Sequence, residues 1–220
     1  MDNLWETRTQ ALKAIETELK REWDVIEGHF EIMDEMISIF HSQMEVSQFY
    51  IAAGLTLLKG RTMAKGILSL ELDGLGQEAG ALLRPLIECS ELLEYFRLFP
   101  DGINQALNNK LPSPGKRAEL IKGTLQGLRN HLNENASHLS LQPSSTKHLI
   151  NFQTGDWKVN QPFDKTALRA NMFSLFLMLS HLSYQAANCL VMYEFPTKLE
   201  TRLNDAKREG LTTFSDLLVV

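Results

Sequence analysis

The sequence predicts an all-α protein, a bundle of about seven helices with a small β-hairpin near residues 147–159. Apolar residues recur at spacings of three and four along most of the 220-residue chain, which is the period of an amphipathic helix. No β–α–β alternation occurs, and β-type residues flank a turn only near 147–159. We therefore expect a single helical domain over residues 1–220.

The first segment, residues 1–42, is expected to be one long acidic helix. Apolar side chains recur from Leu4 to Phe40, with a bend expected at Gly28. Residues 1–50 hold eleven acidic and four basic side chains, whereas the whole chain has a net charge of −5. The chain thus lacks the global basic excess of a nucleic-acid binder, and its N-terminal helix is expected to present an acidic face.

A helical core is expected over residues 44–210. It begins with helical runs at 44–59 and 62–72, separated by Gly60. The stretch "DGLG" at residues 73–76 then ends the pattern.

The next helix, expected at residues 78–97, contains Pro85 near its middle. Proline lacks the backbone N–H and its ring clashes with the carbonyl four residues earlier, that of Ala81. We therefore expect a kink at this point.

The second half of the chain is expected to hold the hairpin and the remaining helices. After a loop with a short helical turn, a helix is expected at 116–133. Another begins after Asp164, a favourable N-cap residue, and ends near Phe195. The last helix is expected at 197–209, with Gly210 in the C-cap position.

The apolar segment 172–193 is long enough to cross a membrane. His181, Gln185 and Asn188 would then lie in the hydrocarbon, at a cost of several kcal/mol. We therefore expect a buried bundle helix and no membrane partner.

No metal site and no cofactor are expected. Di-iron bundles need Glu-x-x-His on two helices, and no histidine here has an acid three residues before it. No zinc, P-loop or nucleophile-elbow motif occurs. The two cysteines, Cys89 and Cys189, are expected to be reduced core residues. With an acidic, polar start unlike a signal peptide, the chain is expected to be cytoplasmic.

The helix at 78–97 carries a narrow polar stripe beside its apolar face. At 100° per residue the members of this stripe lie within about 60° of one another. They form either a solvated surface with an Arg84–Glu88 pair or the lining of a polar cleft. The members are Gln77, Arg84, Glu88, Glu91 and Tyr95.

The helix that follows Asp164 has a matching line of polar residues. These are Ser174, His181, Gln185 and Asn188. Because buried polar groups need partners, the two stripes are expected to share an internal network. The alternative for His181 is a hydrogen-bonded structural histidine.

Residues 104–133 form the only locally basic stretch of any length. Five bases stand against one acid, Glu119, which predicts either a phosphate-binding surface or a solvated helix. The bases are Lys110, Lys116, Arg117, Lys122 and Arg129.

Two short motifs carry a family resemblance. The stretches "ALLRPLIE" at 81–88 and "LNENASHLS" at 132–140 resemble the R-x-L-x-E helix and the following Ser/His segment of a group of bacterial all-α proteins of unknown function. The matching positions are Arg84, Leu86, Glu88, Ser137 and His138.

That group is distantly similar to the HEPN superfamily, helical domains that include ribonucleases of toxin and phage-defence systems. The HEPN active pattern is an arginine, four to six residues, and a histidine. Here eight residues separate Arg129 from His138. The resemblance implies a helical fold more than an activity, and for an active enzyme it implies catalytic roles for these two residues.

The sequence favours a cytoplasmic binding or interaction module with a role in stress or defence, acting on a protein partner and forming a homodimer through a long helix. The alternative is a HEPN-like, metal-independent ribonuclease or nucleotide-acting enzyme with a nucleic-acid partner. There His138 would act as general acid or base, while Arg84 or Arg129 would stabilise a phosphate and Glu88 would orient Arg84.

Overall fold

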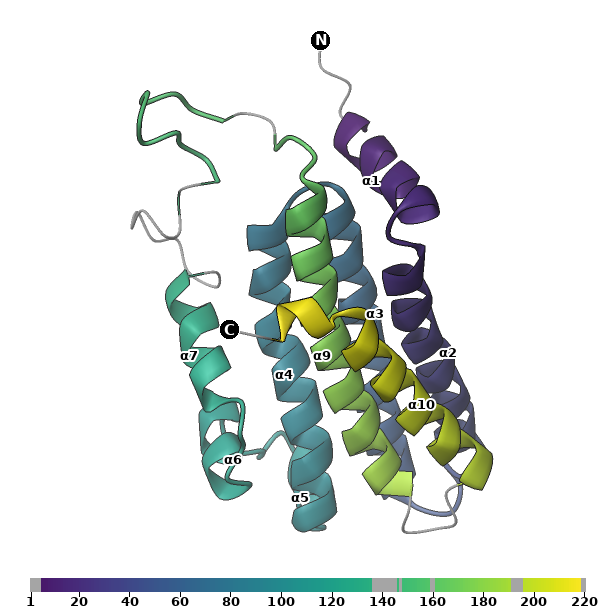
Figure 1. Ribbon diagram of the computed structural model, residues 1–220. Coiled ribbons are helices and arrows are strands. Elements are labelled where there is room, and N and C mark those ends of the chain that lie inside the picture. Colours follow the sequence, from purple (N-terminus) through teal and green to yellow (C-terminus); the bar gives the residue numbers. More distant parts are fainter. Residues whose placement is uncertain (1–4, 136–145, 147, 159–160, 191–195, 219–220) are drawn as a thin grey trace.

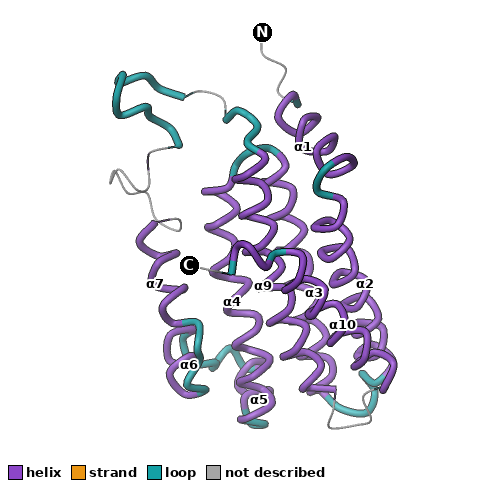
Figure 2. Tube along the Cα trace, in the orientation of Figure 1, coloured by secondary structure: helices purple, strands orange, loops and turns teal. Residues whose placement is uncertain are grey.

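The computed structural model of the chain describes residues 5–135, 146, 148–158, 161–190 and 196–218. These residues form nine α-helices, a short 3₁₀ helix and no β-strand (Figures 1 and 2). The predicted all-α class is confirmed, but the predicted number of about seven helices is too low.

The N-terminal segment is two helices instead of one. Helix α1 spans Glu6–Thr17 and α2 spans Lys20–Ser42. The chain breaks at Leu19, whose side chain is buried in the core, whereas Gly28 lies inside α2. The expected bend was therefore placed nine residues too late, since a buried leucine at a break fits the apolar period of the helix.

Helix α3 is continuous over Gln48–Leu72, so the predicted break at Gly60 is wrong. A Cβ atom at Gly60 would lie 2.7 Å from Leu182 Cδ2 of α9. The glycine therefore serves close helix packing and does not end a helix.

Helix α4, Gly76–Leu98, contains Pro85 as predicted. The helix expected at 116–133 is instead two helices, α6 (Pro114–Leu120) and α7 (Gln126–Asn135), which follow the short α5 (Gly102–Leu107).

Helix α9 spans Lys165–Leu190, and the backbone N–H of Ala167 donates to Asp164 Oδ1 at 3.0 Å, as the N-cap prediction requires. Helix α10, Thr197–Thr213, passes through Gly210 and does not end there. Gly210 lies so close to the ring of Phe176 that a Cβ atom would clash with it. The predicted C-cap is thus a packing glycine.

Helix α9 lies in the middle of the bundle, with α2, α3 and α4 packed around it and α10 crossing it (Figures 1 and 2). Its inner side chains, including Leu175, Phe176, Leu179 and Leu182, are fully buried. This explains a helix that is apolar around most of its circumference. Among the described helices, none is long and apolar enough to cross a membrane.

The predicted hairpin near 147–159 is wrong. One antiparallel bridge joins Ile150 to Trp157 around a turn, and no strand extends it within 148–158. The Trp157 side chain is 82% exposed. An isolated pair of short strands needs a surface to pack on, and this segment has none to cover its largest side chain.

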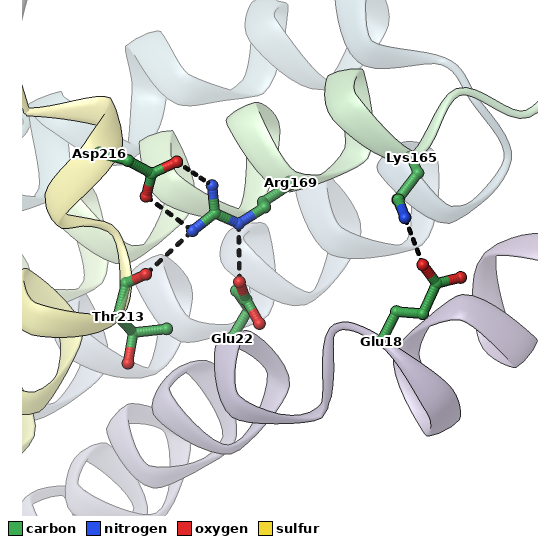
Figure 3. Close-up of polar contacts among 6 residues, drawn as sticks. All are labelled: Glu18, Glu22, Lys165, Arg169, Thr213 and Asp216. Carbon is green, nitrogen blue, oxygen red and sulfur yellow. Dashed lines mark hydrogen bonds and ion pairs between the residues drawn. The ribbon is translucent and has the colours of Figure 1, made fainter.

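Arg169 of α9 connects three parts of the fold (Figure 3). Its Nε atom donates to Glu22 Oε1 of α2 at 2.7 Å, and its Nη2 atom donates to the Thr213 carbonyl at the end of α10 at 2.9 Å. Its Nη1 atom donates to Asp216 Oδ2 at 2.6 Å, within the 3₁₀ helix Ser215–Leu217. A single guanidinium thus fixes the C-terminal segment against the bundle.

Candidate functional site

The polar stripe of α4 begins with a pair that is open to solvent. Arg84 Nε lies 3.4 Å from Glu88 Oε1, and the two side chains are 34% and 23% exposed. Such a pair contributes under about 1 kcal/mol. The solvated interpretation therefore fits this part of the stripe.

Glu91, almost one turn further along α4, is part of a buried ion pair. Arg129 of α7 donates from Nη2 to Glu91 Oε2, and both side chains are 4% exposed. Burial raises the pKa of Glu91, and the adjacent guanidinium counters that rise. The spacing of polar residues along α4 identified Glu91 as a member of the stripe. It did not identify Arg129 as its partner, because Arg129 lies on another helix.

Arg117 of α6 extends this pair into a cluster of charged side chains. It is buried, its Nη1 atom donates to the Pro112 carbonyl at 2.6 Å, and it interacts with Glu88 and Glu91. Burial lowers the pKa of Arg117. Arg84 also pairs with Glu88, so three arginines share two carboxylates here, and the buried part of this cluster joins α4 to α6 and α7.

The basic stretch at 104–133 is therefore divided between the interior and the surface. Arg117 and Arg129 point into the protein, while the other three bases, Lys110, Lys116 and Lys122, are exposed. Of these, Lys116 pairs with Glu119 at 2.9 Å.

Tyr95, the last member of the stripe, is buried where α5 packs on α4. Its hydroxyl donates to Gln105 Oε1 of α5 at 2.9 Å. A Cβ atom at Gly102 would lie 2.6 Å from Tyr95 Cε1, so glycine is needed for this contact. Tyr95 thus has a structural partner and belongs to a small apolar cluster separate from the main core.

The polar line of α9 contacts α4, but the α4 residue involved, Glu94, is not a member of the predicted polar stripe. Gln185 Nε2 donates to Glu94 Oε2 at 3.3 Å, and Glu94 is also 3.8 Å from Arg97. His181 is partly buried, which lowers its pKa. Gln185 and Glu91 therefore belong to two separate polar contacts.

Ser137 and His138 lie outside the described residues. Their roles, and the catalytic role of Arg129 with them, stay predictions.

Two buried titratable side chains were not selected from the sequence. His29 of α2 is fully buried, with Nε2 3.1 Å from Ser180 Oγ, and burial lowers its pKa to about 4. Glu71 of α3 is buried, its Oε2 atom has no hydrogen-bond partner among the described residues, and burial raises its pKa to about 8. Both residues lie at positions where the helical spacing of apolar residues predicts a buried side chain. A polar residue at such a position was the sequence signal that could have identified them.

An apolar patch covers the outer side of the first half of α3 and the turn that leads into it, and we call it the α3 apolar face. Its side chains are between 40% and 62% exposed. Contiguous exposed apolar patches on a folded protein mark sites of association, whereas scattered apolar residues do not. The members are Met44, Val46, Ile51, Leu55 and Leu58.

A hollow between α2 and α3 adjoins this face. It has a volume of about 130 Å³ and a lining that is almost wholly apolar, including Phe40, Ile51 and Leu55. A Cβ atom at Gly54 would lie 2.8 Å from Phe40 Cβ, so the glycine allows the two helices to approach closely beside the hollow. The sequence shows α3 as apolar on more than one side, which is the signal that could have revealed the face.

Among the residues that the structure describes, no group of three His, Cys, Asp or Glu side chains could hold a metal ion. Comparison of the chain with protein-family models, with curated proteins and with solved structures finds no match in any of the three. The function must therefore be inferred from the surfaces and clusters themselves.

Replacing Arg129 with methionine is expected to lower the free energy of unfolding by about 3–5 kcal/mol, because Glu91 is left buried and unpaired. The same change at Arg84, whose pair is open to solvent, is expected to cost under about 1 kcal/mol. Urea unfolding followed by circular dichroism measures both. Equal losses would contradict the division of the stripe into a solvated and a buried part.

Replacing Glu71 with glutamine is expected to stabilise the protein at alkaline pH. The raised pKa means that the folded state keeps a proton which the unfolded chain, with a glutamate pKa of about 4.3, releases. Stability therefore falls as the pH rises from about 4 to about 8, and the glutamine variant avoids this loss, worth a few kcal/mol at pH 9.

Urea midpoints at pH 4 and pH 9 test this, with Glu27→Gln on the exposed side of α2 as the control for losing one surface charge. A Glu71→Gln variant less stable than the parent at pH 9 would show that the carboxylate has a stabilising partner.

Proposed function

We propose that this protein is an interaction module that binds a protein partner through the α3 apolar face. The observation that carries the proposal is the position of Ile51, Leu55 and Leu58, which are 41%, 60% and 43% exposed beside an apolar hollow. Because about half of each side chain is already covered, a partner that buried the rest would contribute about 1 kcal/mol for each.

The alternative, a HEPN-like ribonuclease, has less support. Of the two arginines that would stabilise a phosphate, Arg129 is buried and paired with Glu91, and Arg84 is paired with Glu88. His138→Ala in an RNA-cleavage assay tests that alternative separately. The proposed module acts in the cytoplasm, an expectation that rests on two buried, unpaired thiols, Cys89 and Cys189.

The proposal is tested by placing a photoreactive benzoylphenylalanine at Leu58 in cells that make the protein. We expect irradiation to give one discrete protein adduct, which disappears when Leu55→Asp is added, because a charge on the face prevents docking. The matched control is the same probe at Leu177 of α9, which is 41% exposed.

Absence of an adduct at position 58, or equal adducts at positions 58 and 177, would refute a docking role for this face. Circular dichroism of the purified Leu55→Asp chain checks that the folded structure is kept.

A further inference from the structure

We infer that the partner at the α3 apolar face is a second copy of this chain, packed as an antiparallel pair of α3 helices about a two-fold axis beside Leu55. This inference rests on the proposed function, since it names the occupant of the same face.

The outer side of α3 carries a heptad seam. Exposed residues recur along it at alternating spacings of three and four, the pattern by which helices pair in coiled coils. These side chains are exposed, so no other described helix of the bundle covers the seam. Its members are Gln48, Ile51, Leu55, Leu58, Thr62 and Lys65.

The apolar part of this seam is nearly symmetric about Leu55, with Ile51 four residues before it and Leu58 three residues after it. A two-fold interface requires that each residue meets a counterpart in a self-complementary way. In an antiparallel pair centred here, Leu55 meets the partner's Leu55, and Ile51 meets the partner's Leu58. The Ile51–Leu58 contact occurs twice, once from each copy. The six apolar side chains of the two seams therefore cover one another, and no other protein is needed.

The polar ends of the seam are complementary in the same register. Gln48 falls opposite the partner's Thr62, so an amide can donate to a hydroxyl. The turn before α3, which carries Glu45, lies at the same end of this pair as the partner's Lys65, and neither side chain has an ion-pair partner among the described residues. Each of these contacts occurs twice.

The same residues exclude the parallel arrangement. A parallel pair in register would place Lys65 beside the partner's Lys65 and Glu45 beside the partner's Glu45. Like charges at such positions are destabilising and select against a pairing mode. Charge therefore favours the antiparallel register.

The hollow between α2 and α3 provides a place for a partner side chain. At about 130 Å³ it is close to the size of an apolar cavity that accepts benzene, and Ile51 and Leu55 of the seam form part of its wall. A leucine from the opposing seam, such as the partner's Leu58, can enter it as a knob enters a hole.

The first test is the mass of the purified full chain by sedimentation velocity across a dilution series. We expect a species of twice the 25.0 kDa chain mass that dissociates on dilution. Leu55→Asp should raise the dimer Kd at least about 100-fold, because two carboxylates meet at the axis. Leu177→Asp, at a similarly exposed leucine of α9, should leave the Kd unchanged.

The register is tested by charge reversal. Glu45→Lys and Lys65→Glu should each raise the Kd about tenfold, because each creates two like-charge contacts. The double variant restores both pairs and should return the Kd to within about threefold of the parent. A double variant no better than either single change would overturn the antiparallel register.

Cysteine cross-linking gives an independent check. Leu55→Cys should form an intermolecular disulfide on oxidation, whereas Ile51→Cys alone should not, and the native Cys89 and Cys189 are buried and do not compete.

The two proposals fail in different ways. A chain that stays monomeric at all concentrations, with no cross-link at position 55, overturns the second-copy inference. If the probe at position 58 still captures a different protein in cells, the interaction module stands. If that probe also captures nothing, both proposals fall.

Discussion

Burial of α9 is the constraint on which the rest of the fold depends. This helix is apolar around most of its circumference, and its inner side chains are fully buried. Such a helix is stable in water only when neighbours cover it, and α2, α3, α4 and α10 do so. Close approach by these neighbours explains two glycines, because Gly60 and Gly210 lie directly against Leu182 and Phe176.

Two arginines hold elements of the bundle to one another. Arg169 links α9 to Glu22 and to the segment after α10, as Figure 3 shows, and Arg129 links α7 to Glu91 of α4. Both guanidiniums are engaged by carboxylates, so they stabilise the fold and are not available to a ligand. The apolar side of α3 is different, because its side chains are exposed beside an apolar hollow and have no partner that the described part of the fold supplies.

The sequence predicts helix type and position well where apolar period and caps agree. The helix containing Pro85 and the helix begun by Asp164 are examples. The sequence does not predict correctly where one helix ends and the next begins. The break at Leu19 depends on burial of that side chain in the core, and Gly60 is a packing residue that resembles a helix stop. Propensity is a local signal, and these features are decided by neighbours.

The candidate site shows the same division. The polar stripe of α4 is visible from its spacing, and it includes Glu91. The partner of Glu91 is not visible, because Arg129 comes from 38 residues further along the chain. The α3 apolar face could not be separated from the core either, since a leucine that faces solvent and a leucine that faces α9 give the same pattern. Only the three-dimensional packing distinguishes them.

The central claim is that Ile51, Leu55 and Leu58 are covered by a partner in the native assembly. Hydroxyl-radical footprinting of the full chain, read by mass spectrometry in cells and in dilute purified protein, measures this coverage directly. We expect these three side chains to be protected in cells and labelled in the dilute protein, while Leu177 is labelled in both. Equal labelling of the α3 apolar face under the two conditions would contradict the claim.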